Sequence, residues 1–147
     1  MKCAMKSSDD LRDFSRNLPM ALLRAREAVM ARFRPILRAH GLSEQQWRVL
    51  RVLADEDGLE ISALAERTLL LMPSLTRILK GMEEAALVAR EGVAGDKRRR
   101  VMRLTDAGRE RFAVIAPLSE GEYRGIEEAV GAEELERLYG LLGKLGE

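Results

Sequence analysis

A short basic run, 95–100, lies between two segments whose hydrophobic residues alternate as in β-strands. These segments are 87–91 and 101–104, and the turn-rich stretch 92–96 favours the tip of a hairpin between them. The chain as a whole is nearly neutral, with 25 Lys and Arg against 24 Asp and Glu. Its positive charge is therefore concentrated on one hairpin. That placement indicates a polyanionic partner, and a basic hairpin beside a helix start at Thr105 favours duplex DNA.

The rest of the chain predicts helices, because its hydrophobic residues recur at helical spacing. The segment from Asp9 to His40 is expected to be mostly helical, with its main helix starting near Asn17. Further helices are expected from Ser43 to the acidic segment 55–58, over 63–68, over 74–85, from Thr105 to Gly131, and over 132–145. The expected N-caps are Asn17, Ser43 with Gln46 completing a capping box, Ser62 and Thr105. Ser74 is a cap in the alternative in which its helix face is simply solvated. A short edge strand is expected at 59–61.

This order of elements predicts a mainly α (α+β) fold, a winged helix-turn-helix with N- and C-terminal dimerisation helices. The expected regions are 1–40 for the N-terminal dimerisation helix, 41–105 for the DNA-binding lobe and 106–147 for the C-terminal dimerisation helices. They form one compact domain. The terminal helices carry more apolar surface than so small a chain can bury alone, which predicts a homodimer.

Several other classes of protein are disfavoured. No apolar run is long enough to cross a bilayer and the N-terminus lacks a signal-peptide core, so a cytoplasmic protein without a membrane partner is expected. One His and one Cys do not make a metal-ligand cluster, and no phosphate-binding glycine loop or nucleophile–base pair occurs. We therefore expect no enzyme activity, metal or cofactor. Acidic runs such as 55–57 are interpreted as solvated faces and caps.

Several segments occur in an order and at a spacing typical of one family. They are Ile61–Arg67, Pro73–Glu83, Leu87–Val88, Asp96–Arg99 and Leu104–Gly108. Together they resemble the MarR family of dimeric winged-helix transcription regulators, commonly repressors released by small phenolic ligands. The segments 17–27, 33–37 and 41–50 further resemble members that repress the degradation of 4-hydroxyphenylacetate and homoprotocatechuate. Many relatives carry an Asp-Pro pair early in the wing, where this chain has 92–95.

The second helix of the helix-turn-helix is the predicted recognition helix, whose first turns enter the major groove. Arg77 is expected to fork onto a guanine, while Ser74 and Thr76 bond phosphates or base edges. Lys80 fits a phosphate contact and plain solvent exposure equally well.

The hairpin is the predicted wing. Arg98 at its tip is the candidate for the minor groove, whose negative potential attracts arginine. Asp96 is expected either to pair with Arg98 and orient it, as the family's Asp-x-Arg pattern implies, or to form the turn. Lys97, Arg99 and Arg100 are expected to contact phosphates, although strand alternation turns some of them away.

The resemblance also implies a ligand site where the first helices meet the DNA-binding lobe. A carboxylate-bearing phenol needs a fixed cation and an apolar slot. The candidate residues are Arg24, Arg26, His40, Trp47 and Arg48, with Arg24 as the possible anchor. Four of them have a structural alternative: ion pairs for Arg24 and Arg26, a helix end for His40 and the core for Trp47.

The predicted function is a MarR-type repressor of an operon for degrading 4-hydroxyphenylacetate or homoprotocatechuate, released by a phenolic ligand. Its partners are a second copy of the chain and double-stranded DNA with a pseudo-palindromic operator. The alternatives left open are another phenolic signal, oxidation at Cys3, or a winged-helix module for protein contacts.

Overall fold

The computed structural model describes residues 12–147 as helices and one hairpin. The elements are the 3-10 turn η2 (Phe14–Arg16), α1 (Leu18–Ala39), α2 (Glu44–Asp55), α3 (Ile61–Thr68), α4 (Met72–Glu84), β1 (Val88–Val93), β2 (Asp96–Leu104), α5 (Asp106–Val130) and α6 (Ala132–Gly146). The predicted class, mainly α with a two-stranded antiparallel wing, is confirmed.

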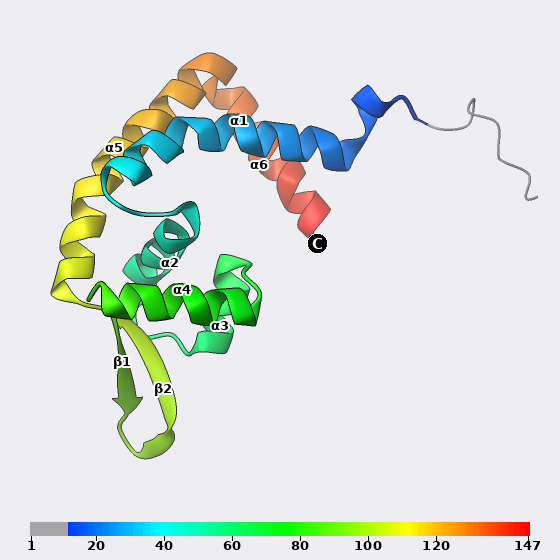
Figure 1. The fold of residues 1–147 in the computed structure, drawn as a ribbon. Coiled ribbons are helices and arrows are strands. Elements are labelled where there is room, and N and C mark those ends of the chain that lie inside the picture. The colour runs from blue at the N-terminus through cyan, green and yellow to red at the C-terminus, as the bar shows by residue number, and fades with distance from the viewer. Residues whose placement is uncertain (1–11) are drawn as a thin grey trace, which may run out of the picture.

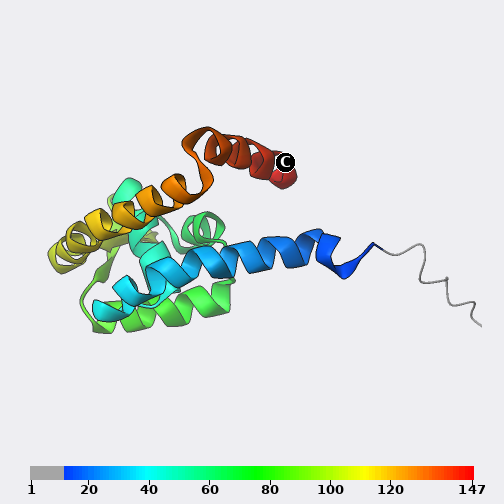
Figure 2. The same ribbon diagram turned by 90° about the horizontal axis from the view of Figure 1, so that it is seen from above.

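The elements form a helical lobe beneath a frame of long helices (Figure 1). α2, α3 and α4 make up the lobe, and the β1–β2 hairpin projects from it on the side away from α1 and α6. α1 lies above the lobe in this view, and α5 rises along one side of it from the base of the hairpin. Figure 2 shows that the N-terminal half of α1 and most of α6 extend past the lobe on the same side.

The lobe is held together by a fully buried aliphatic core. Its members from α2, α3 and α4 are Val49, Leu50, Leu53, Leu64, Leu75, Leu79 and Met82. Met102 from β2 and Ile115 from α5 close this core. Each such side chain contributes about 1.5–3 kcal/mol through burial, so the lobe holds α4 and the wing in a fixed relation.

Three of the predicted N-caps are confirmed. The Asn17 side chain accepts a bond from the Met20 amide at 3.2 Å, and Thr105 Oγ1 accepts one from the Gly108 amide at 3.0 Å. Ser43 and Gln46 form both bonds of the capping box, at 3.0 and 3.1 Å. These caps fix where α1, α2 and α5 begin, because each satisfies an amide that the helix leaves unpaired.

The predicted cap at Ser62 and the alternative cap at Ser74 are wrong. α3 begins at Ile61 and α4 at Met72, and neither start has a side-chain cap. Pro73 suits the first turn of a helix because its missing N–H would have no helical partner there. α4 therefore starts before the proline, and Ser74 lies inside the first turn of the helix.

The wing differs from the predicted hairpin in two ways. β2 begins at Asp96, so the basic run belongs to a strand and only 94–95 form the tip, with Gly95 at φ +82°. The register shifts between Gly92 and Val93. The predicted edge strand is reduced to one bridge, in which the Met102 amide donates to the Leu59 carbonyl at 2.7 Å.

The wing and α5 are joined by a close backbone approach at Gly108. A β-carbon at this position would lie 2.1 Å from the carbonyl oxygen of Leu87, which is far inside contact distance. The same carbonyl accepts a bond from the Thr105 amide at 3.1 Å. The glycine therefore lets the start of α5 lie directly against the start of the wing.

Candidate DNA-binding surface and effector cavity

The exposed face of α4 carries the predicted recognition residues. Thr76, Arg77 and Lys80 are exposed and Ser74 is half-buried, whereas the residues between them that face the lobe are buried. The spacing of three and four residues places Thr76 and Lys80 on one face with Arg77 beside it. Thr76 Oγ1 donates to the Met72 carbonyl at 2.9 Å. Within residues 12–147 neither Arg77 nor Lys80 forms an ion pair, so both side chains are available to bind an anion.

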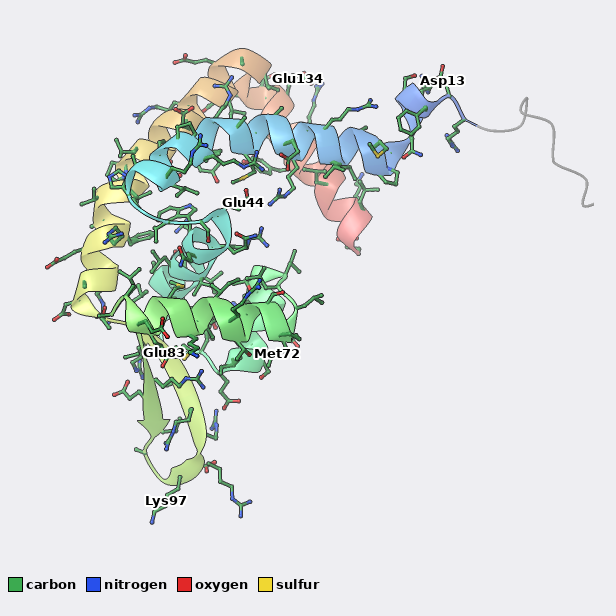
Figure 3. The ribbon with its side chains drawn as sticks, viewed as in Figure 1. Asp13, Glu44, Met72, Glu83, Lys97 and Glu134 are labelled. Carbon is green, nitrogen blue, oxygen red and sulfur yellow. The ribbon has the colours of Figure 1, made fainter. Side chains whose placement is uncertain are left out.

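The wing tip presents two outward cations. Lys97 points away from the body of the molecule (Figure 3). Both Lys97 and Arg98 are exposed, and neither pairs with a carboxylate in the part of the chain that the structure describes. Asp96 Oδ1 accepts a bond from the backbone amide of Arg98 at 2.9 Å. Asp96 thus stabilises the turn through the backbone, and the Arg98 guanidinium stays available.

The other two arginines of the basic run lie along the stem of the wing. Arg99 forms an ion pair with Glu60, which lies immediately before α3. Arg100 extends across its cross-strand neighbour Gly92, where a β-carbon would lie 3.0 Å from Nη1. The run therefore divides into a free tip and an anchored stem.

Asp57 holds the base of the wing, a role that its interpretation as a solvated acidic residue missed. Its Oδ1 accepts a bond from the Leu104 amide at 3.0 Å, and its Oδ2 accepts one from Arg109 Nη2 at 2.9 Å. One carboxylate thus ties the end of α2 to β2 and α5. The acidic segment 55–57 alone does not predict these contacts, because Leu104 and Arg109 lie far from Asp57 in the sequence.

A cavity of about 240 Å³ lies between α1, α2 and α5. Its lining residues are Val29, Met30, Phe33, Glu44, Trp47, Arg48, Arg51, Val52 and Tyr123. Trp47 stacks on Phe112 with ring centroids 5.4 Å apart, and Phe33 packs on Tyr123 at 5.0 Å. The cavity combines aromatic walls with two guanidinium groups, a combination that suits an aromatic anion.

The structure brings two of the five predicted ligand residues, Trp47 and Arg48, to this cavity. Three further polar lining residues, Glu44, Arg51 and Tyr123, were not predicted. Arg51 lies on the same face of α2, one turn beyond them, and Tyr123 comes from α5. Burial is the main cause that raises the pKa of the Tyr123 hydroxyl, which therefore stays protonated and able to donate a hydrogen bond.

The other three predicted ligand residues lie outside the cavity lining. The Arg24 guanidinium lies 5.5 Å from the ring centroid of Phe14. Arg26 pairs with Glu44 at 2.5 Å. His40 ends α1, and its Nδ1 is 2.8 Å from a backbone carbonyl one turn earlier. Arg26 and His40 thus occupy the structural alternatives that their positions suggested, whereas Arg24 contacts an aromatic ring instead of the expected carboxylate.

Glu44, which lies between α1 and α2 (Figure 3), connects the cavity to an ion-pair network between these helices. Its carboxylate accepts bonds from Arg26 and from Arg34 Nε, the latter at 3.1 Å. The bond from Arg26 is the main cause that lowers the pKa of Glu44, followed by Arg34, with burial opposing both. The network fixes α1 against the start of α2 and closes one end of the cavity.

We expect low pH to weaken the ion pairs of Glu44 with Arg26 and Arg34. Because the folded pKa of Glu44 lies below its unfolded value, its stabilisation is present above about pH 5 and lost as the pH falls through the folded pKa. Glu44→Gln should therefore be less stable at pH 7 and should lose less of its free energy of unfolding between about pH 6 and pH 3. Urea titrations across this range measure both effects.

The control is Glu134→Gln, which removes an exposed carboxylate on α6 that pairs only with its helical neighbour Arg137. It should follow the wild-type dependence on pH, because exposed pairs contribute little. A Glu44→Gln variant with the acid sensitivity of wild type would contradict the assigned role.

The described residues contain neither a membrane-spanning helix nor a group of metal ligands. Over 12–147 no helix is both long and apolar enough to span a membrane. The same residues contain no group of three or more His, Cys, Asp or Glu side chains placed to hold a metal ion. Cys3, the candidate for an oxidation signal, lies outside the described residues.

A helix-turn-helix whose second helix exposes free cations, followed by a hairpin with a cationic tip, defines the winged-helix class of DNA-binding proteins. Residues 40–99 match the family model described as "MarR family". With relatives of about 40% identity over most of its length, the chain belongs to the MarR family. It is a DNA-binding transcriptional regulator and not an enzyme.

Three similar proteins illustrate the relationship. The homoprotocatechuate degradative operon repressor of Escherichia coli is 42% identical over 126 residues, which cover 86% of this chain and 85% of that protein. The transcriptional regulator FarR of Neisseria gonorrhoeae is 39% identical, with 88% of each chain covered. The crystal structure of NadR in complex with 4-hydroxyphenylacetate superposes with a TM-score of 0.79 at 37% identity, covering 92% of this chain and 96% of that one.

Proposed function

We propose that this protein is a homodimeric, cytoplasmic repressor of an operon for degrading an aromatic acid of the 4-hydroxyphenylacetate class. The ligand binds in the cavity between α1, α2 and α5 and releases the protein from its operator. The observation that carries the proposal is the pairing of aromatic walls with Arg48 and Arg51 in one cavity. The names of the E. coli repressor and of the NadR complex support the same ligand class.

The chemistry of the cavity fits a small phenolic acid. Arg51, which pairs with the exposed Asp55 at 2.9 Å, exchanges this carboxylate for that of the ligand, and the Trp47 ring supplies an apolar wall. Elsewhere in the lining, the protonated Tyr123 hydroxyl donates a hydrogen bond and the Glu44 carboxylate accepts one. A volume of about 240 Å³ suits a ligand with one ring, since sites for drug-sized ligands are larger.

Exposed apolar residues on the terminal helices support the homodimer. They lie on α6 and on the N-terminal half of α1, the two segments that extend past the lobe (Figure 2). They include Leu18, Leu22, Leu23, Leu138, Leu141, Leu142 and Leu145. A two-fold dimer through these segments carries two recognition helices, whose half-sites must lie about one helical turn, roughly 34 Å, apart.

The contacts with DNA are proposed from the exposed cations. Arg77 forks onto a base edge in the major groove, Ser74 and Thr76 bond phosphates or base edges, and Lys80 contacts a phosphate. On the wing, Arg98 enters the minor groove from a turn stabilised by Asp96, and Lys97 contacts a phosphate. Arg99 reaches a phosphate only by leaving Glu60, and Arg100 does so by swinging away from Gly92.

A DNA-release experiment tests the proposal. The wild-type protein selects a duplex from a random library, and fluorescence anisotropy of that labelled duplex follows binding at increasing 4-hydroxyphenylacetate. We expect the Kd for DNA to rise about tenfold or more at saturating ligand, as typical coupling free energies of 1–3 kcal/mol allow. Arg51→Met should require a much higher ligand concentration for the same release.

The matched control is Arg38→Met, which removes an exposed cation near the end of α1 that lines no part of this cavity. It should respond to the ligand at the wild-type concentration. A wild-type protein that binds its selected duplex equally tightly with and without the acid contradicts the proposed ligand class.

A further inference from the structure

Arg48 connects the effector cavity to the turn of the helix-turn-helix. Its side chain lines the cavity, yet its Nη1 donates to the backbone carbonyl of Thr68 at 2.9 Å. Thr68 is the last residue of α3, and it is fully buried. One guanidinium therefore contacts both the space for the ligand and the end of the first helix of the DNA-binding unit.

The Thr68 carbonyl depends on this partner. The last four carbonyls of a helix receive no hydrogen bond from an N–H of the same helix. The negative end of the helix dipole also favours a cation there. Arg48 meets both needs at the C-terminus of α3. The Thr68 hydroxyl is itself committed, because it donates to the Leu64 carbonyl at 2.6 Å.

The chain directly after Thr68 is the connection that orients α4. Leu69 has left-handed backbone angles, φ +54° and ψ +38°, and its side chain is 87% exposed. This conformation is unfavourable for a residue with a β-carbon, so the surrounding bonds must hold it in place. Only Leu70 and Leu71 separate it from the start of α4. A change at the Thr68 carbonyl thus acts on the turn that sets the recognition helix.

We propose that Arg48 is the residue that couples ligand binding to DNA release. A carboxylate in the cavity competes with the Thr68 carbonyl for the guanidinium, and the charge-assisted bond is the stronger of the two. Arg48 then leaves α3, the turn at Leu69 loses its support, and α4 no longer keeps its orientation for the major groove. The DNA-competent form retains the Arg48–Thr68 bond, so DNA and ligand each weaken the binding of the other.

This inference rests on the proposed function for its ligand, but its main consequence does not need the ligand. Arg48→Met keeps the length of the side chain and removes the donor, so it should place the free protein in the released form. We expect its Kd for the selected duplex to be about tenfold higher than that of Arg38→Met, which also loses one positive charge. We also expect 4-hydroxyphenylacetate to change that Kd by less than twofold.

Arg48→Lys separates coupling from a general loss of structure. It keeps the cation at the end of α3, so it should recover most of the DNA affinity and a measurable ligand response. Anisotropy titrations of all three variants, with and without 4-hydroxyphenylacetate, and thermal unfolding of each give the required comparison.

The outcomes separate the two proposals. Arg48→Met that binds the duplex as tightly as Arg38→Met overturns the coupling role whatever the ligand is. The coupling role is also overturned if Arg48→Met is folded and 4-hydroxyphenylacetate raises its Kd for the duplex by the same factor as in the wild type. If the wild type ignores the acid while Arg48→Met binds DNA weakly and Arg48→Lys recovers, the proposed ligand class fails and the coupling role stands.

Discussion

Replacing Gly108 by Ala should lower the free energy of unfolding by about 3 kcal/mol, the upper part of the range for overpacking a tight site. The new β-carbon would lie 2.1 Å from the Leu87 carbonyl oxygen, and both groups belong to the backbone. Relief requires α5 and the wing to move apart, which also disturbs the bond between the Thr105 amide and Leu87. Urea denaturation followed by circular dichroism measures the loss.

The control is Gly81→Ala, the same substitution inside α4. A β-carbon there meets nothing within 4 Å, so the higher helix propensity of alanine should raise the free energy of unfolding by about 0.5–1 kcal/mol. Opposite signs for the two variants are the expected pattern. A Gly108→Ala protein as stable as wild type would show that the junction between the wing and α5 yields at little cost.

Arg77→Ala should reduce affinity for the selected duplex about 10- to 100-fold and relax the base preference at one position of each half-site. The reason is the loss of a bidentate contact, which discriminates between bases by about 1–3 kcal/mol. Anisotropy titrations against the selected duplex and against single-base variants of it measure both effects. Binding to a duplex of random sequence should change much less.

Arg98→Ala is the matched comparison, because it also removes one exposed arginine. It should weaken binding to all sequences and reduce the slope of log K against log salt by about 1 for each half-site. Affinity for DNA that is unchanged in Arg98→Ala would exclude the minor-groove contact. An Arg77→Ala protein that keeps its full base preference would move sequence recognition to other residues.

Local signals in the sequence were sufficient to predict most of the fold. Caps such as Asn17 and Ser43 act on amides two or three residues away, so their patterns are visible in a short segment. The caps at Ser62 and Ser74 were wrong because serine is also common inside a first turn. α4 begins at Met72 because a helix accepts a proline such as Pro73 at its second position.

The sites were harder to predict because their contacts join distant parts of the chain. The pairing of Arg99 with Glu60 spans 39 positions, and that of Arg109 with Asp57 spans 52. No periodicity along one segment indicates such partners. Arg51 could have been predicted from the sequence, since it lies four residues after Trp47 on the same helix face. Tyr123 could not, because only the packing of α5 on α1 and α2 brings it to the cavity.

The stacked pair of Trp47 and Phe112 has a practical consequence. Trp47 is the only tryptophan among the 147 residues, and it forms part of the cavity wall. Its intrinsic emission therefore comes from one known place, with no other indole to dilute the signal. A ligand that enters beside the indole changes the surroundings of the sole emitter, so occupancy is visible optically in unmodified protein, separately from any effect on DNA.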